Sequence, residues 1–171
     1  MQEGDTENPT LKLAEQLAVL NLPVMIQQAW TRPEETTSCF QCARNRRSQL
    51  FDLARQLGCN KIAFGHHKDD LIETFFLNLL YSGNISTMVP KQELFEGRLS
   101  VIRPMAYLVK DEILRIGQAA GLHAMPSYCP FAKDSRREKI KAIIGMLREQ
   151  EPECEKSIFS ALGNVRTEYL L

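Results

Sequence analysis

The sequence predicts an α/β fold with a parallel sheet, and three patterns carry that prediction. Residues 62–64, Ile-Ala-Phe, form a short apolar run that ends at Gly65, which is typical of a buried parallel strand. Apolar residues then recur at spacings of three and four over residues 71–80, which predicts a helix with one wide apolar face. Residues 99–105 and 110–120 repeat this order of strand and helix. Such alternation favours a parallel sheet.

The rest of the chain divides into further helices, one short strand and loops. The other predicted helices cover residues 13–20, 42–57, 140–147 and 158–165. Residues 24–29 are predicted to form a short strand, and residues 83–97 a long loop after Ser82-Gly83-Asn84. We expect residues 1–10 to be a disordered lead-in and residues 11–171 to form a single domain.

Composition limits the setting in which the protein works. With 44% hydrophobic and 25% charged residues it has the make-up of a soluble globular protein. Basic and acidic residues balance at 21 each, so a nucleic-acid-binding surface has to be a local patch. No apolar run approaches the roughly 20 residues of a membrane helix, so no membrane contact is expected. Five cysteines without a secretion signal argue against a disulfide scaffold and for the cytoplasm.

The loop between residues 64 and 71 is the first candidate site. It follows a predicted strand and precedes a predicted helix, which is where open α/β sheets place their ligands. Gly65 would let the backbone approach a ligand, and the carboxylates of Asp69 and Asp70 could hold Mg²⁺. Both aspartates could equally cap the helix. His66 could be a packing residue, and Arg103, directly after a strand, could clamp a phosphate or lie on the surface.

The cysteines are the second candidate site. Cys39 and Cys42 form a Cys-x-x-Cys pair, and Cys129 follows about ninety residues later between two prolines. Thiolates at this spacing can share one metal centre, and arginines that follow the pair would stabilise them electrostatically: Arg44, Arg46 and Arg47. A redox pair and a zinc site completed by a histidine are the alternatives. Cys59 is expected to be a small core residue, and Cys154, between two glutamates, a poor ligand.

Four stretches in order give the chain a resemblance to a known family. They are residues 39–47 with Cys-Phe-Gln-Cys and Arg46-Arg47, residues 65–74 (Gly-His-His-Lys-Asp-Asp-Leu-Ile-Glu-Thr), residues 102–104 (Ile-Arg-Pro) and residues 159–165 (Phe-Ser-Ala-Leu-Gly-Asn-Val). In these the sequence resembles the tRNA 2-thiocytidine synthetases among the PP-loop ATP pyrophosphatases. The family's first signature, a Ser-Gly-Gly-x-Asp-Ser loop, does not occur in this sequence.

The resemblance implies a fold, and it implies that another chain would complete the site. The fold would be a Rossmann-like parallel sheet of the adenine nucleotide alpha-hydrolase type that lacks its first strands and has extra carboxyl-terminal helices. Residues 24–29 would then lack their family neighbour in the sheet. We therefore expect a fragment, a half whose partner is a separate chain, or a rearranged remnant. A homodimer or a chain that supplies the PP-loop would complete the site.

The resemblance also implies an activity, that of a tRNA-thiolating sulfurtransferase, which forms 2-thiocytidine by adenylating the base with ATP and transferring sulfur through an iron–sulfur cluster. Cys39, Cys42 and Cys129 would be the catalytic thiols that hold a 4Fe–4S cluster, one iron of which could carry sulfur. Gly65, His66, Asp69, Asp70 and Arg103 would line a pocket for ATP and Mg²⁺.

Arg44, Arg46 and Arg47 would contact tRNA, whereas arginines and lysines at 136, 137, 139 and 141 are better explained as a solvated helix face. A sulfur donor protein would be a further partner. The alternatives are an enzyme acting on a small molecule and a non-catalytic subunit, stabilised by a cluster or zinc, that completes a partner's site.

Overall fold

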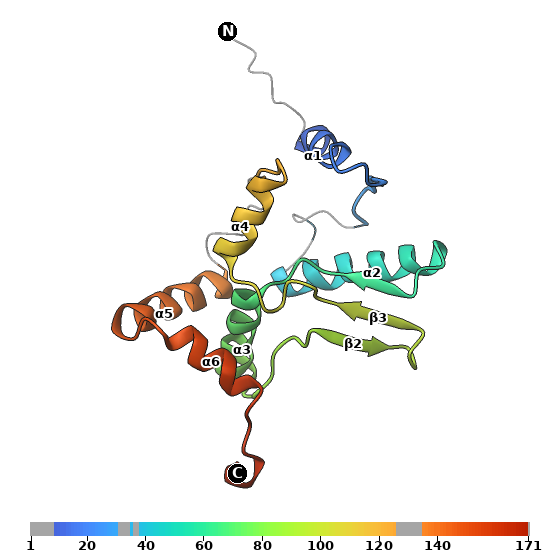
Figure 1. Ribbon diagram of the computed structural model, residues 1–171. Coiled ribbons are helices and arrows are strands. Elements are labelled where there is room, and N and C mark those ends of the chain that lie inside the picture. Colours follow the sequence, from blue (N-terminus) through green and yellow to red (C-terminus); the bar gives the residue numbers. More distant parts are fainter. Residues whose placement is uncertain (1–8, 31–34, 36–37, 126–134, 171) are drawn as a thin grey trace.

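The computed structural model describes residues 9–30, 35, 38–125 and 135–170 (Figure 1). The strands are β1 (Lys61–Ala63), β2 (Lys91–Leu94) and β3 (Leu99–Ile102). The helices are α1 (Pro9–Ala18), α2 (Cys39–Gln56), α3 (Lys68–Ser82), α4 (Lys110–Ala119), α5 (Arg136–Gln150) and α6 (Cys154–Leu162), followed by the short 3-10 helix η2 (Thr167–Tyr169). The predicted α/β class is confirmed. The prediction of one domain over residues 11–171 stays a prediction, although α1 already begins at Pro9.

The described sheet is mixed rather than purely parallel. Its strand order is β1-β3-β2, with β1 parallel to β3 and Ile62 opposite Val101. β2 lies antiparallel to β3 and occupies part of the predicted loop. The turn between them has positive φ at Phe95, Glu96 and Gly97, which reverses the chain tightly. The exposed residues of β2 show no alternation of apolar and polar side chains, so the sequence pattern gave no sign of a strand.

The predicted strand over residues 24–29 was wrong. In the structure these residues form neither helix nor strand, and Val24, Met25 and Ile26 are exposed. A strand exists only when its backbone groups pair with a neighbour. In the described part of the chain no strand pairs with this segment, so its β-favouring residues remain irregular.

The core forms where three helices meet. Ile72 of α3 and both Ile140 and Ile144 of α5 are buried together, and Ile158 and Phe159 of α6 pack against them. Figure 1 shows α5 and α6 lying beside α3, with α2 and the sheet on its other side. The loop that precedes α3 therefore lies between the sheet and the carboxyl-terminal helices. Among the described residues, no helix is long and apolar enough to cross a membrane.

Candidate functional site

The loop between β1 and α3 is fixed to the segment that follows β3. Phe64 N donates to Ile102 O at 2.9 Å, and Lys68 N donates to Leu108 O at 2.9 Å. The carboxyl ends of two parallel strands thus meet at this loop, as the sequence predicted. A Cβ on Gly65 would lie 3.5 Å from Met105 Cε, an ordinary van der Waals contact. Packing by itself therefore does not require glycine at this position.

Asp69 and Asp70 make contacts that organise the start of α3. Asp70 Oδ2 accepts from His67 N at 3.0 Å, and Asp69 Oδ2 lies 3.0 Å from His67 Nδ1. Asp69 Oδ2 also accepts from Lys110 N at 3.0 Å, which joins the start of α4 to the start of α3. The capping role that the sequence left open is thus present in the structure. The side chain of His67 contacts both carboxylates, through Nδ1 with Asp69 and through Nε2 with Asp70.

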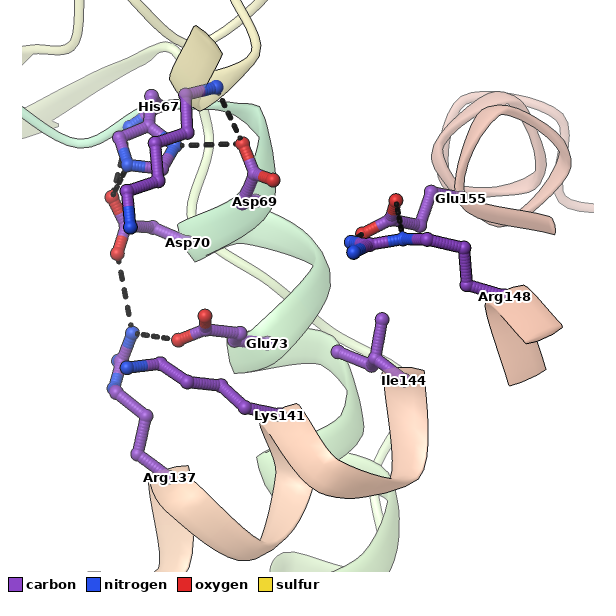
Figure 2. A pocket seen from close by; sticks show the side chains of 10 residues that line it. His67, Asp69, Asp70, Glu73, Arg137, Lys141, Ile144, Arg148 and Glu155 are labelled. Carbon is purple, nitrogen blue, oxygen red and sulfur yellow. Dashed lines mark hydrogen bonds and ion pairs between the residues drawn. The ribbon is translucent and has the colours of Figure 1, made fainter. Parts of the chain in front are cut away.

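A partly buried ion pair joins this helix start to α5. Arg137 Nη1 lies 2.8 Å from Glu73 Oε2 and 3.3 Å from Asp70 Oδ1 (Figure 2). Burial raises the pKa of Glu73, and the charge of Arg137 acts against that rise. The interpretation of residue 137 as part of a solvated helix face was therefore wrong. Arg136 makes a cation–π contact, since its guanidinium lies 4.8 Å from the centre of the Tyr81 ring.

A pocket of about 360 Å³ opens beside these charged groups. Figure 2 shows Arg137 and Lys141 reaching from α5 towards the acidic residues of α3, with the Arg148–Glu155 pair on another side. Its lining combines four basic and four acidic residues with one histidine and one isoleucine: His67, Asp69, Asp70, Glu73, Lys110, Arg137, Lys141, Ile144, Arg148 and Glu155. Because the charges balance, the pocket is polar without a strong preference for one sign of ligand.

A second group of polar side chains lies at the ends of β1 and β3. Arg103 is only 8% exposed; one guanidinium nitrogen donates to Val89 O, whereas its Nε has no hydrogen-bond partner among the described residues. Nδ1 of His66 is likewise buried and unpartnered within the described chain. Burial lowers the pKa of His66, Asp70 acts in the opposite direction, and the charges of Arg103, Arg137 and Arg47 lower it further.

Arg47 belongs electrostatically to this second group. Burial is the larger cause that lowers the pKa of Arg103, and the nearby charge of Arg47 lowers it further. Arg47 stands on α2, and the sequence analysis assigned it to RNA contact together with Arg44 and Arg46. The structure places all three on the exposed surface of α2. Of the three, Arg47 is the one whose charge lowers the pKa of both Arg103 and His66. The guanidinium groups of Arg47 and Arg103 therefore make a positive region beside His66, which suits an anion.

Cys39 and Cys42 lie at the start of α2. Ser38 caps this helix, since its side chain accepts from Gln41 N at 3.2 Å. Cys39 is the exposed first residue and Cys42 lies one turn later, half-buried, so the two thiols share a helix face. That arrangement fits two ligands of one soft metal centre. Cys129 lies outside the described residues, and the described residues alone contain no group of three potential metal ligands.

The remaining two cysteines, Cys59 and Cys154, lie apart from this pair, at the end of α2 and the start of α6. Cys59 is exposed, with its sulfur 4.0 Å from Leu57 O, so the expectation that it is a core residue was wrong. The helix α2 ends before Gly58, and the turn that follows directs residue 59 away from the core. Cys154 is the half-buried first residue of α6.

These features define an α/β protein whose candidate ligand loop lies at the carboxyl ends of two parallel strands, and one of whose helices begins with a pair of cysteines. A family model described as a PP-loop domain matches residues 2–143. The chain belongs to this PP-loop family.

The relatives and the structural neighbour agree with that membership. The chain is 41% identical over 170 residues to the tRNA-cytidine(32) 2-sulfurtransferase of Alkalilimnicola ehrlichii, a match that covers 95% of this chain and 54% of the relative. It is 42% identical over 135 residues to that of Syntrophotalea carbinolica, covering 78% and 52%. Its fold is similar, with a TM-score of 0.63 and 20% identity, to the U34-tRNA thiolase NcsA from Methanococcus maripaludis with its 4Fe–4S cluster. That match covers 100% of this chain and 60% of the thiolase. The chain spans about half the length of the relatives named here.

Proposed function

We propose that this chain takes part in the thiolation of a cytidine in tRNA, as a sulfurtransferase or as the part of one that binds sulfur and RNA. The observation that carries the proposal is the similarity, 41% over 95% of the chain, to a tRNA-cytidine(32) 2-sulfurtransferase. The positions of the two candidate sites support it. The paired thiols and the positive region that includes Arg47 both involve α2. A sulfur-carrying site and an anion-binding site on one helix suit a reaction that combines both.

We propose Cys39, Cys42 and Cys129 as the thiols that hold a 4Fe–4S cluster. When bound, such a cluster supplies an iron without a protein ligand, to which a sulfur atom can attach. The described part of this site fits, because the exposed Cys39 and the half-buried Cys42 lie one turn apart at a helix start. Zinc is the alternative metal, and it would require a fourth ligand to close its tetrahedral site.

We propose Gly65, His66 and Arg103, with Asp69 and Asp70, as the groups that bind ATP with Mg²⁺. The unpartnered nitrogens of His66 and Arg103 and the nearby charge of Arg47 support phosphate binding. The reaction would join the C2 oxygen of the cytidine to AMP and release pyrophosphate; sulfur then forms the new bond at C2 as AMP leaves. Asp69 contacts His67 and Asp70 contacts Arg137, so a Mg²⁺ ion would have to displace one of these contacts.

The first test concerns the metal. We expect the anaerobically reconstituted chain to hold about four iron and four sulfide per chain. Cys39→Ala, Cys42→Ala or Cys129→Ala should abolish this, because each removes a proposed ligand. Cys59→Ala and Cys154→Ala are the matched controls and should retain full iron content. Stoichiometric zinc with no iron after anaerobic reconstitution would contradict the cluster.

The second test concerns tRNA. The chain would be produced in a host that lacks its own cytidine thiolation, alone and together with a segment carrying a Ser-Gly-Gly-x-Asp-Ser loop, and 2-thiocytidine measured by nucleoside mass spectrometry. We expect 2-thiocytidine with the added segment, because that loop supplies the backbone amides for phosphate binding. The Cys39→Ala variant should produce none. Thiolation of free cytidine but not of tRNA would instead support an enzyme for a small molecule.

A further inference from the structure

An exposed aromatic side chain lies beside the loop between β1 and α3. Tyr107 follows β3 and is 69% exposed, although its neighbour Ala106 is fully buried. The turn that carries it is held by two backbone hydrogen bonds, from Ala106 N to Arg103 O at 3.1 Å and from Leu108 N to Met105 O at 3.0 Å. The ring is therefore presented to solvent on a backbone anchored in the fold.

Phe159 contacts this ring, and Lys68 in turn lies over Phe159. The rings of Tyr107 and Phe159 meet edge to face, with centres 6.0 Å apart and planes at 88°. Phe159 belongs to α6 and packs on its other side against the helical core. Lys68 Nζ lies 5.0 Å from the centre of the Phe159 ring. The stretch 159–165, which the sequence analysis found but did not explain, thus contributes the residue that braces Tyr107.

Two lysines lie close to this turn, one over the Phe159 ring and one three residues further along the chain. Lys68 begins α3, and Lys110, three residues after Tyr107, begins α4 and lines the pocket. The backbone N–H of Lys110 donates to Asp69, so the turn that carries Tyr107 is tied directly to the proposed nucleotide loop. Proteins that bind single-stranded nucleic acids combine an accessible aromatic ring with positive charge nearby, because bases stack on the ring and phosphates meet the charged groups.

We propose that Tyr107, braced by Phe159 with Lys68 over that second ring, is a stacking platform for an unpaired base of the RNA. The inference rests on the proposed function and extends it by assigning a surface for a nucleobase outside the pocket. The platform would hold a base of a loop next to Asp69 and Asp70. Stacking needs the ring but not the phenol hydroxyl.

A matched aromatic pair elsewhere in the fold provides the control. Phe95 and Phe51 also meet edge to face, with centres 6.0 Å apart and planes at 87°, and Phe95 is largely exposed. Phe95 lies in the turn before β3, whereas Tyr107 follows the opposite end of that strand. The two pairs therefore share their geometry but differ in their distance along β3 from the proposed site.

The experiment measures binding of the full chain to a labelled RNA hairpin with a cytidine-containing loop, and to a duplex of the same stem, by fluorescence anisotropy over a range of salt concentrations. We expect wild type to prefer the hairpin. Tyr107→Ala should weaken hairpin binding by about tenfold and leave duplex binding unchanged, because one stacked base is lost. Tyr107→Phe and the control Phe95→Ala should bind as wild type does.

Salt dependence separates stacking from phosphate contact. Tyr107→Ala should leave the slope of log K against log salt unchanged. Lys68→Gln should make that slope less steep, by the amount that corresponds to about one lost phosphate contact. Circular dichroism and thermal unfolding verify that each variant is folded. If wild type binds the hairpin and Tyr107→Ala binds equally well, the platform is refuted while the proposed function stands. If wild type binds neither RNA, both are refuted.

Discussion

The helical core and the amino-terminal segment of residues 19–30 are both rich in apolar residues, yet only the first buries them. Ile140 of α5 is 0% exposed, whereas Ile26 is 58% exposed. The difference lies in what each has to pack against. α5 meets α3 and α6 on their apolar faces, whereas the described residues give segment 19–30 neither a strand to pair with nor a regular structure of its own. Apolar composition thus produces burial only where a second apolar surface is placed opposite.

The largest expected effect comes from the core side of this comparison. Ile140→Ala should lower the free energy of unfolding by about 2–5 kcal/mol, because it removes fully buried carbons and leaves a cavity. Ile26→Ala is the matched control and should change it by no more than about 0.5 kcal/mol. Urea denaturation of both variants measures these values. Equal losses would show that segment 19–30 is packed in solution.

An intermediate effect is expected where charged groups join the core to the candidate site. The side chain of Arg137 is 39% exposed and that of Glu73 is 11% exposed, so their ion pair lies between the surface and the fully buried case. Arg137→Ala should therefore cost about 1–3 kcal/mol, because Glu73 loses its partner in a buried place. Lys91→Ala breaks an exposed pair with Glu93 and should leave the free energy of unfolding nearly unchanged. If the two variants lower the free energy of unfolding equally, the partial burial of the Arg137–Glu73 pair adds nothing to its contribution.

The smallest effect concerns pH and the second polar group. Burial holds the pKa of His66 below the ordinary value of 6.5, so below pH 6.5 the unfolded chain binds a proton that the folded chain does not. The contribution of His66 to stability should therefore be unimpaired above pH 6.5 and should decline as the pH falls below it. His66→Gln should flatten this part of the pH profile of the unfolding free energy. An unchanged profile would mean that His66 titrates normally.

Glu73 acts on the pH profile with the opposite sign. Its raised pKa means that the folded chain keeps a proton more firmly than the unfolded chain above pH 4.5. The contribution of Glu73 to the free energy of unfolding should therefore decline as the pH rises from 4.5 to the higher pKa of the folded state. Glu73→Gln should remove this component, and comparison of the two variants separates the two contributions.

The sequence by itself determined the helices and the place of the candidate site. Apolar spacing fixes α3, because a periodicity of 3.6 residues is read within the segment itself. The aspartates after Gly65 predict the helix start, and the structure has Asp70 accepting from His67 N there. The Cys-x-x-Cys spacing of Cys39 and Cys42 is likewise local, but the predicted helix began at residue 42, whereas α2 begins at Cys39 and places both thiols in its first turn.

Only the tertiary structure decided which distant groups meet. Arg137 contacts Asp70 across 67 positions and Glu73 across 64, and a local pattern carries no information about such separations. The same applies to β2 and to residues 24–29. Lys91–Leu94 became a strand because β3 offered it a partner, and residues 24–29 remained irregular in the described chain because they had none. A helix forms its hydrogen bonds within one segment, whereas a strand and an ion pair depend on a second segment that only the fold brings into place.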